Sequence, residues 1–195
     1  MKKIVALLMG LLLLSSCRSV SYDDLNPTIQ PNDNLLPVLE IRPDYASIRA
    51  IYTSKRDERV ADAVNIFTKE VRENIMQQTG EKKGNITMRI SYGKTNHNKI
   101  YEITSGFIYI PTLLGVPYYN AEQILEVEVL IQNKHKDVIR RYTESVSNTE
   151  YAAMYWGYKK EDVDRKVAAI NMRNAMENIR HRINNDAPQI RVELK

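Results

Sequence analysis

The residues that most often carry out catalysis are few in this chain of 195 residues, and they form no known catalytic pattern. The three histidines, His97, His135 and His181, stand far apart in the sequence. His97 and His135 fall in polar segments typical of turns, and His181 lies near the end of a predicted helix, where a cation suits the helix dipole. A metal site needs clustered ligands, such as two histidines one helical turn apart or paired cysteines. We therefore expect no metal site and no cofactor.

Glu126 and Glu128 form a pair of carboxylates whose spacing suggests acid and base chemistry. They alternate with Leu125, Val127 and Val129 in the clearest strand pattern of the chain, so both side chains would project from one face. Two carboxylates about 5 to 9 Å apart in a cleft can hydrolyse a glycosidic bond, but the same alternation is typical of a solvated sheet face. Because the sequence also lacks a serine-hydrolase turn and a phosphate-binding loop, we expect no enzyme activity. A cell-wall or glycan hydrolase stays an alternative.

The beginning of the chain has the pattern of a secretory signal. Two lysines precede an apolar run from Ile4 to Leu14, and two serines and Cys17 follow. The run is too short to span a bilayer, which needs about 20 apolar residues. The last four residues, Leu14 to Cys17, resemble the lipobox of bacterial lipoproteins, in which the cysteine thiol takes up a diacylglyceryl group. The resemblance implies that residues 1–16 are a signal peptide and that the mature chain begins at a lipidated Cys17.

Cys17 is also the one cysteine of the sequence. An unpaired thiol is a liability in an oxidising compartment, whereas a lipidated thiol is no longer reactive, so an ordinary signal peptide that happens to contain a cysteine is the weaker alternative. Two or three acyl chains, palmitate among them, hold a protein at a membrane durably. In the sorting scheme of enteric lipoproteins an aspartate after the cysteine favours the inner membrane. Arg18 occupies this position, which implies the outer membrane, facing the periplasm.

Composition limits the remaining possibilities. The formal net charge is +4, and it would be +2 without the two lysines of the signal. Nucleic-acid binding calls for a strongly basic face, so we expect no nucleic-acid partner. Residues 17–35 are polar and contain two prolines, which is typical of a flexible stalk. Residues 36–195 are enough for one domain with a full core.

The periodicity of apolar residues predicts the elements of that domain. The expected strands are 36–41, 48–52, 86–92, 99–105, 125–131 and 138–146, the last two joined as a hairpin by a turn at 133–137, with another turn at 93–98. One helix is expected over 60–75, ended by Gly80, and a second over 161–184. Pro188 should end the second helix, and 190–194 would form a short edge strand.

This order predicts an α+β domain with a mainly antiparallel sheet and two amphipathic helices on one face. Together with the lipobox and the polar stalk, the order of elements resembles that of the YajG-type envelope lipoproteins. That family is mostly of unknown function and is not known for enzymes, so the resemblance implies no site residues.

The uncharged segment 106–119 is the strongest candidate for a contact surface, and a second aromatic cluster follows at 151–158. Pro111 and Pro117 exclude a regular helix or central strand across the segment. It can cover the core, enter the membrane interface or bind a partner protein, and the aromatic residues can equally fill a corner between sheet and helix. The predicted contact residues are Phe107, Tyr109, Leu113, Leu114, Val116, Tyr118, Tyr119, Tyr155 and Trp156.

We therefore expect a non-enzymatic protein, anchored in the cell envelope by acyl chains, that serves as an accessory or binding subunit for an envelope partner protein. A hydrophobic-ligand carrier, which would need a dry cavity between helices and sheet, is a further alternative to the hydrolase.

Overall fold

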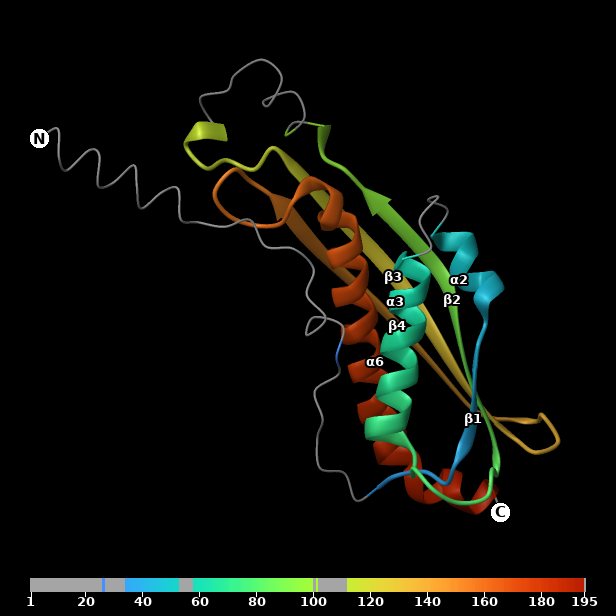
Figure 1. Cartoon of the computed structure of the whole chain (residues 1–195). Helices are drawn as coiled ribbons and strands as arrows, with labels where there is room; N and C mark the ends of the chain where they lie inside the picture. Colours follow the sequence, from blue (N-terminus) through green and yellow to red (C-terminus); the bar gives the residue numbers. More distant parts are fainter. Residues whose placement is uncertain (1–25, 27–33, 53–57, 100, 102–111, 195) are drawn as a thin grey trace, which may run out of the picture. The chain divides into compact units, whose positions relative to one another are not determined.

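Four strands form one sheet in the computed structural model, in the order β1-β2-β3-β4 (Figure 1). The structure describes residue 26 and residues 34–52, 58–99, 101 and 112–194. The sheet is mostly antiparallel and is combined with helices, so the predicted α+β class is confirmed. The α-helices among the described residues number three, not the two expected.

The first strand, β1, joins the sheet in parallel orientation. It spans Leu39–Pro43 and pairs with the beginning of β2, Gly84–Asn96, in a register that sets Leu39 opposite Gly84 and Pro43 opposite Met88. A parallel pair needs a long crossover connection, usually helical. The helical segments between β1 and β2 supply it.

The second element is a helix, and the strand predicted at 48–52 is wrong. Helix α2 spans Tyr45–Ile51. Asp44 caps it, because its side chain accepts hydrogen bonds from the backbone N–H groups of Ala46 (3.1 Å) and Ser47 (3.3 Å). The alternation of apolar residues favoured a strand, but the cap satisfies the first amides of a helix and only Ile48 of its residues is buried.

The helix predicted over 60–75 is confirmed. It comprises α3, Glu58–Glu70, and a final π-helical turn, η2, Val71–Ile75, in which Met76 N–H donates to Val71 O over 3.0 Å. Gly80 follows with φ of +139°, beyond the end of the helix.

The predicted strand 86–92 is confirmed but is longer than expected. β2 continues to Asn96, so the residues from Gly93 to Asn96, which were expected to turn, are extended. Lys99 and Tyr101, in the predicted strand 99–105, are helical, and the other residues from Ile100 to Ser105 lie outside the described residues.

The predicted hairpin is confirmed and is also longer than expected. β3 spans Tyr119–Asn133 and β4 spans Val138–Ala152. The turn is closed by Asn133 N–H donating to Asp137 O over 3.1 Å. The alternation of apolar and polar residues from Leu125 to Ile131, whose apolar side chains are buried, explains why this hairpin could be predicted.

The last helix, α6, spans Lys160–Glu193 and does not end at Pro188. Proline lacks the N–H that would bond to the carbonyl four residues earlier, yet tertiary contacts hold the final turns. Ile190 and Leu194 are buried, and Arg191 Nε donates to Leu35 O over 3.1 Å. The edge strand predicted at 190–194 is therefore wrong.

The chain divides into two compact units, and β2, β3, β4 and α6 contribute to both. The described part of one unit, which we call the aromatic unit, comprises residues 95–99, 101, 112–123 and 148–167. The other, the sheet unit, comprises the described residues within 22–94, 124–147 and 168–195.

A buried ion pair joins α3 to α6 inside the sheet unit. Arg180 Nη1 donates to Glu70 Oε1 over 2.9 Å, and the two side chains are 2% and 5% exposed. Asn74 Nδ2 donates to the other oxygen of Glu70 over 3.1 Å. Burial raises the pKa of Glu70 above its ordinary value, and the Arg180 guanidinium offsets part of this rise.

Candidate functional site

Five large apolar side chains lie exposed on two turns of the aromatic unit. They are Leu113, Leu114 and Val116 on the first turn and Met154 and Trp156 on the second. Leu114 is 80% exposed and Trp156 is 46% exposed. Single exposed apolar residues are common, but a group of them marks an interaction site. We call these five residues the apolar loop surface.

Glycines allow the chain to form both turns. In the first turn Gly115 N–H donates to Thr112 O over 3.0 Å, with φ of +88° at the glycine. In the second turn Gly157 has φ of +79°, and a Cβ at this position would stand 2.4 Å from Tyr151 O. Both φ values lie in the left-handed region that favours glycine. The turns are therefore specified locally.

Trp156 connects the two turns. Its indole Nε1 donates to Gly115 O over 2.7 Å, although the ring itself stays half exposed. Behind this contact, Tyr118 N–H donates to Ala152 O over 3.0 Å, where the segments that lead into the turns run side by side. The apolar loop surface is thus held in a fixed arrangement, which lowers the entropy that a partner would have to freeze on binding.

An aromatic and aliphatic cluster supports these turns. Its buried members are Tyr119, Ala121, Ala152, Val163 and Val167, and Tyr118 and Tyr158 pack against it. Tyr151 lies between two further rings: its centroid is 6.2 Å from that of Trp156 and 6.2 Å from that of Tyr101. Edge-on and tilted ring pairs at such separations are favourable. Among the described aromatic residues of the unit, Tyr119 is buried, Trp156 is exposed and the others are half-buried, so these rings pack against one another and against the cluster at the edge of the interior.

A polar group links the start of β3 to α6 within the same unit. Tyr119 Oη donates to Asp164 Oδ1 over 3.0 Å, and the His97 ring stacks on Tyr119 with 5.1 Å between centroids. His97 Nδ1 lies 3.1 Å from Asn120 O, and Asn98 N–H donates to Asn120 Oδ1 over 2.9 Å. The residues that enter and leave the connection between β2 and β3 are thereby held together.

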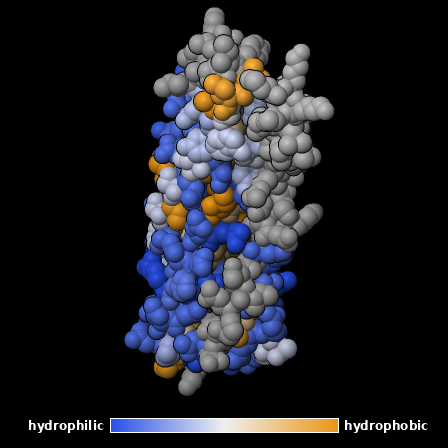
Figure 2. Space-filling view, turned by 90° about the vertical axis from the view of Figure 1, so that its left-hand side faces the viewer, coloured by the Kyte–Doolittle hydropathy of each residue, from blue (hydrophilic) through white to orange (hydrophobic). Residues whose placement is uncertain are grey.

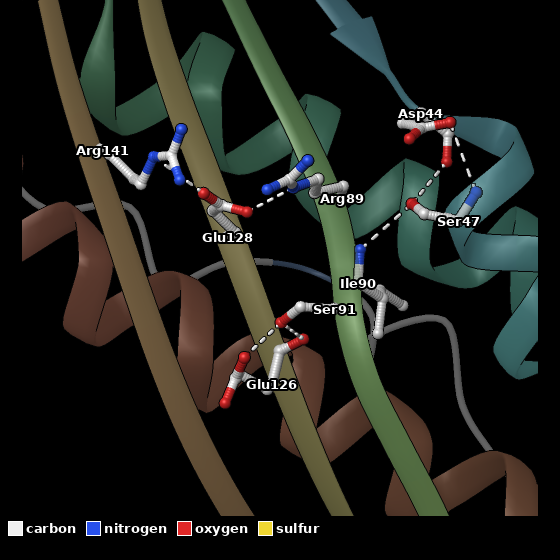
Figure 3. Close-up of polar contacts among 8 residues, drawn as sticks. All are labelled: Asp44, Ser47, Arg89, Ile90, Ser91, Glu126, Glu128 and Arg141. Carbon is white, nitrogen blue, oxygen red and sulfur yellow. Dashed lines mark hydrogen bonds and ion pairs between the residues drawn. The ribbon is translucent and has the colours of Figure 1, made fainter.

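Glu126 and Glu128, the carboxylates considered for hydrolysis, lie on the face of the sheet away from the helices (Figure 3). Glu128 is buried between Arg89 of β2 and Arg141 of β4: Arg89 Nε donates to Oε2, and Arg141 Nε lies 3.0 Å from Oε1. Glu126 accepts a hydrogen bond from the Ser91 hydroxyl. Both oxygens of Glu128 thus face guanidinium groups, as in a cross-strand ion pair that stabilises a sheet.

Only part of the predicted contact set falls among the described residues. Cys17, Phe107 and Tyr109 lie outside them, so their predicted roles stay predictions. The remaining residues differ in accessibility: Tyr119 is buried in the cluster, Tyr118 and Tyr155 are half-buried, and Leu113, Leu114, Val116 and Trp156 are exposed.

Met154 was not predicted as a contact residue, nor was the Trp156–Gly115 hydrogen bond. The signal that could have found both is the glycine in each apolar segment, since Gly115 and Gly157 mark turns that would bring nearby side chains to the surface.

The surface of the described residues is mainly hydrophilic in the view of Figure 2, with hydrophobic residues in small separate groups. No helix among the described residues is both long and apolar enough to cross a membrane. Nor do three or more His, Cys, Asp or Glu side chains of the described part of the chain come together where they could hold a metal ion.

No model of a known protein family matches the sequence, and no curated protein matches it significantly. Solved structures are similar at low sequence identity. A candidate lipoprotein from Caulobacter crescentus CB15 aligns over 80% of this chain and 91% of its own, with 9% identity and a TM-score of 0.38. A minor lipoprotein from Acinetobacter baumannii aligns over 80% of this chain and 95% of its own, with 11% identity and a TM-score of 0.40.

Proposed function

We propose that this protein is a non-enzymatic lipoprotein of the cell envelope, anchored through Cys17, that binds an envelope partner protein with its apolar loop surface. The anchor rests on the lipobox-like residues before Cys17 and implies, through Arg18, the outer membrane facing the periplasm. The binding role rests on the five exposed apolar side chains and on the hydrogen bond from Trp156 to Gly115 that fixes their two turns.

Two features favour a protein partner over the lipid interface as the occupant of this surface. The apolar side chains stand on turns fixed by backbone hydrogen bonds, and preorganised surfaces of this kind give specific protein contacts. Acyl chains on Cys17 would already supply durable membrane binding, so a second membrane contact would add little.

The binding role is tested by a photo-crosslinking residue at Leu114 in the cell, followed by identification of the adduct. We expect the crosslinker at Leu114 to capture one envelope protein. In a second experiment the crosslinker is placed at Val116, and the double substitution Leu113→Asp, Leu114→Asp on the same chain should abolish capture. Val192→Asp is the control, because Val192 is an apolar residue of α6 in the sheet unit whose exposed fraction lies between those of Leu113 and Leu114. Capture of lipid alone, or equal loss with Val192→Asp, would contradict the proposal.

The anchor is tested separately by metabolic labelling with an alkyne analogue of palmitate. The wild-type chain should be labelled and the Cys17→Ala variant should not. A mature N-terminus at any other residue would refute the anchor and leave the binding role open.

The hydrolase alternative makes a different prediction. If Glu126 and Glu128 acted in catalysis, Glu126→Gln would fail to complement a strain that lacks the protein, whereas the double variant Leu113→Asp, Leu114→Asp would complement it. We expect the reverse, because Glu126 is engaged by Ser91 and Glu128 by two arginines.

A further inference from the structure

A cationic hollow lies in the sheet unit, beside the turn between β3 and β4. Its volume is about 230 Å³, several times the roughly 30 Å³ that one water molecule occupies in the liquid. Four basic side chains line it together with one acidic and one amide side chain: Arg42, Lys82, Lys134, Lys136, Glu40 and Asn85. The hollow therefore carries a net charge of +3 from its lining.

Local ion pairs neutralise only part of this charge. Arg42 Nη2 lies 2.9 Å from Glu40, and Lys134 pairs with Glu81 outside the hollow. The hydrogen bond from Arg42 lowers the pKa of Glu40, with a smaller contribution from Lys82. Among the described residues, no acidic side chain forms an ion pair with Lys82 or Lys136. Two ammonium groups are thus left in excess.

The turn that carries two of these lysines is held rigidly. Asn133 Oδ1 accepts hydrogen bonds from the N–H groups of His135 and Asp137, both over 2.9 Å, and Lys136 adopts the left-handed conformation with φ of +71°. A residue other than glycine in this conformation is uncommon and is sustained by its surroundings. The cationic residues of the turn therefore start from a fixed backbone.

Asn85 gives the hollow a directional group. Its side chain is only 8% exposed, and it lies on β2 between the strands that carry Arg42 and the turn. An amide can donate to an anion while lysine and arginine supply charge, which is a combination suited to phosphate oxygens. The hollow also exceeds the size of a lone anion, so it has room for part of the molecule that bears the phosphate.

We propose that this hollow is a binding site for a phosphate-bearing ligand, held by Lys82, Lys136, Arg42 and Asn85. The phosphate belongs either to a soluble phosphorylated compound or to the headgroup of an anionic phospholipid. The site is separate from the apolar loop surface, so it stands or falls independently of the proposed partner binding.

The test is a titration of the full mature chain in non-ionic detergent, followed by NMR of its backbone amides. The probes are pyrophosphate, short-chain phosphatidylglycerol and short-chain phosphatidylcholine. We expect pyrophosphate or phosphatidylglycerol to cause saturable chemical-shift changes of the amides of Gly84, Asn85 and Lys136. Binding should weaken as the salt concentration is raised. The Lys82→Gln, Lys136→Gln double variant should bind at least about tenfold more weakly, because it removes two of the positive charges that face the ligand; a tenfold loss corresponds to about 1.4 kcal/mol.

The matched control is the Lys94→Gln, Lys159→Gln double variant, which removes the same charge from exposed lysines outside the hollow. It should bind within about twofold of the wild type. Saturation with pyrophosphate supports a soluble ligand, and saturation with phosphatidylglycerol but not phosphatidylcholine supports a lipid headgroup. The proposal is overturned if neither pyrophosphate nor phosphatidylglycerol saturates, or if both double variants weaken binding equally.

Discussion

The buried pair of Glu70 and Arg180 allows a quantitative test of the fold. Replacing Arg180 with methionine leaves the Glu70 carboxylate buried without its charged partner, and breaking a buried pair in this way costs about 3–5 kcal/mol of the free energy of unfolding. The upper half of this range is expected, because the side chains are only 2% and 5% exposed and the pair joins α3 to α6. The Asn74 amide would be the remaining donor to Glu70.

The same variant should depend strongly on pH. Burial already raises the pKa of Glu70 above that of an ordinary glutamate, so the folded chain binds this proton more tightly than the unfolded chain. A group of this kind makes the free energy of unfolding fall as pH rises from the unfolded pKa to the folded one. Without Arg180 the folded pKa rises further, so the loss in Arg180→Met should be smaller at about pH 5 than at about pH 7.

Urea denaturation followed by circular dichroism at both pH values measures these changes. The control is the double variant Glu70→Met, Arg180→Met, which removes both charges and should lie within about 1–2 kcal/mol of the wild type. The reasoning is refuted if Arg180→Met costs less than about 1 kcal/mol, or if its cost is the same at the two pH values.

Three smaller perturbations test the two proposed sites and their turns. Trp156→Phe removes the hydrogen bond to Gly115 O and should destabilise the chain by about 0.5–1.5 kcal/mol, while the amide of Gly115 exchanges its hydrogen faster; unchanged exchange would argue against the link. Gly157→Ala should lower the melting temperature, because the residue has φ of +79° and a Cβ would meet a carbonyl oxygen at 2.4 Å; an unaltered melting curve would contradict this. Hydrogen bonding from Lys134 and Lys83 lowers the pKa of Glu81 to about 2, so its stabilising contribution is present above pH 4.5 and lost as pH falls toward 2. Lys134→Gln should return that pKa toward 4.5 in a carboxyl NMR titration, and no movement would exclude the pair in solution.

The elements that could be predicted are those whose burial pattern is local. The alternation in β3 and the stripe of apolar residues in α3 follow from the period of each structure, so one pass along the chain is enough to find them. The turn between β3 and β4 was predicted for the same reason, since Asn133 forms its hydrogen bonds within five residues.

The errors occur where a competing signal decided the structure. Residues 48–52 alternate as a strand would, but Asp44 caps a helix at this point. The Ser47 hydroxyl strengthens the cap by donating to Asp44 O over 2.9 Å. Pro188 predicts a helix end, yet the buried Ile190 and the contact from Arg191 continue the helix. In the second case a tertiary contact outweighs local propensity, and no local pattern can show that.

The candidate site could be predicted in part. The apolar, uncharged composition of 106–119 indicated a contact surface, and Leu113, Leu114 and Val116 are exposed. The hydrogen bond from Trp156 to Gly115 joins residues 41 positions apart, so it depends on the register of β3 against β4. The same holds for the arginines around Glu128 and for the hollow, whose lining comes from β1, from β2 and the residues just before it, and from the hairpin turn.

The contacts of Asn120 with His97 and Asn98 have a consequence for engineering. These contacts join the two ends of the connection between β2 and β3. The entropic cost of closing such a connection grows only slowly with its length. An engineered change in this connection should therefore keep Asn120, because its side chain accepts the hydrogen bond from Asn98 N–H that holds the two ends of the connection together.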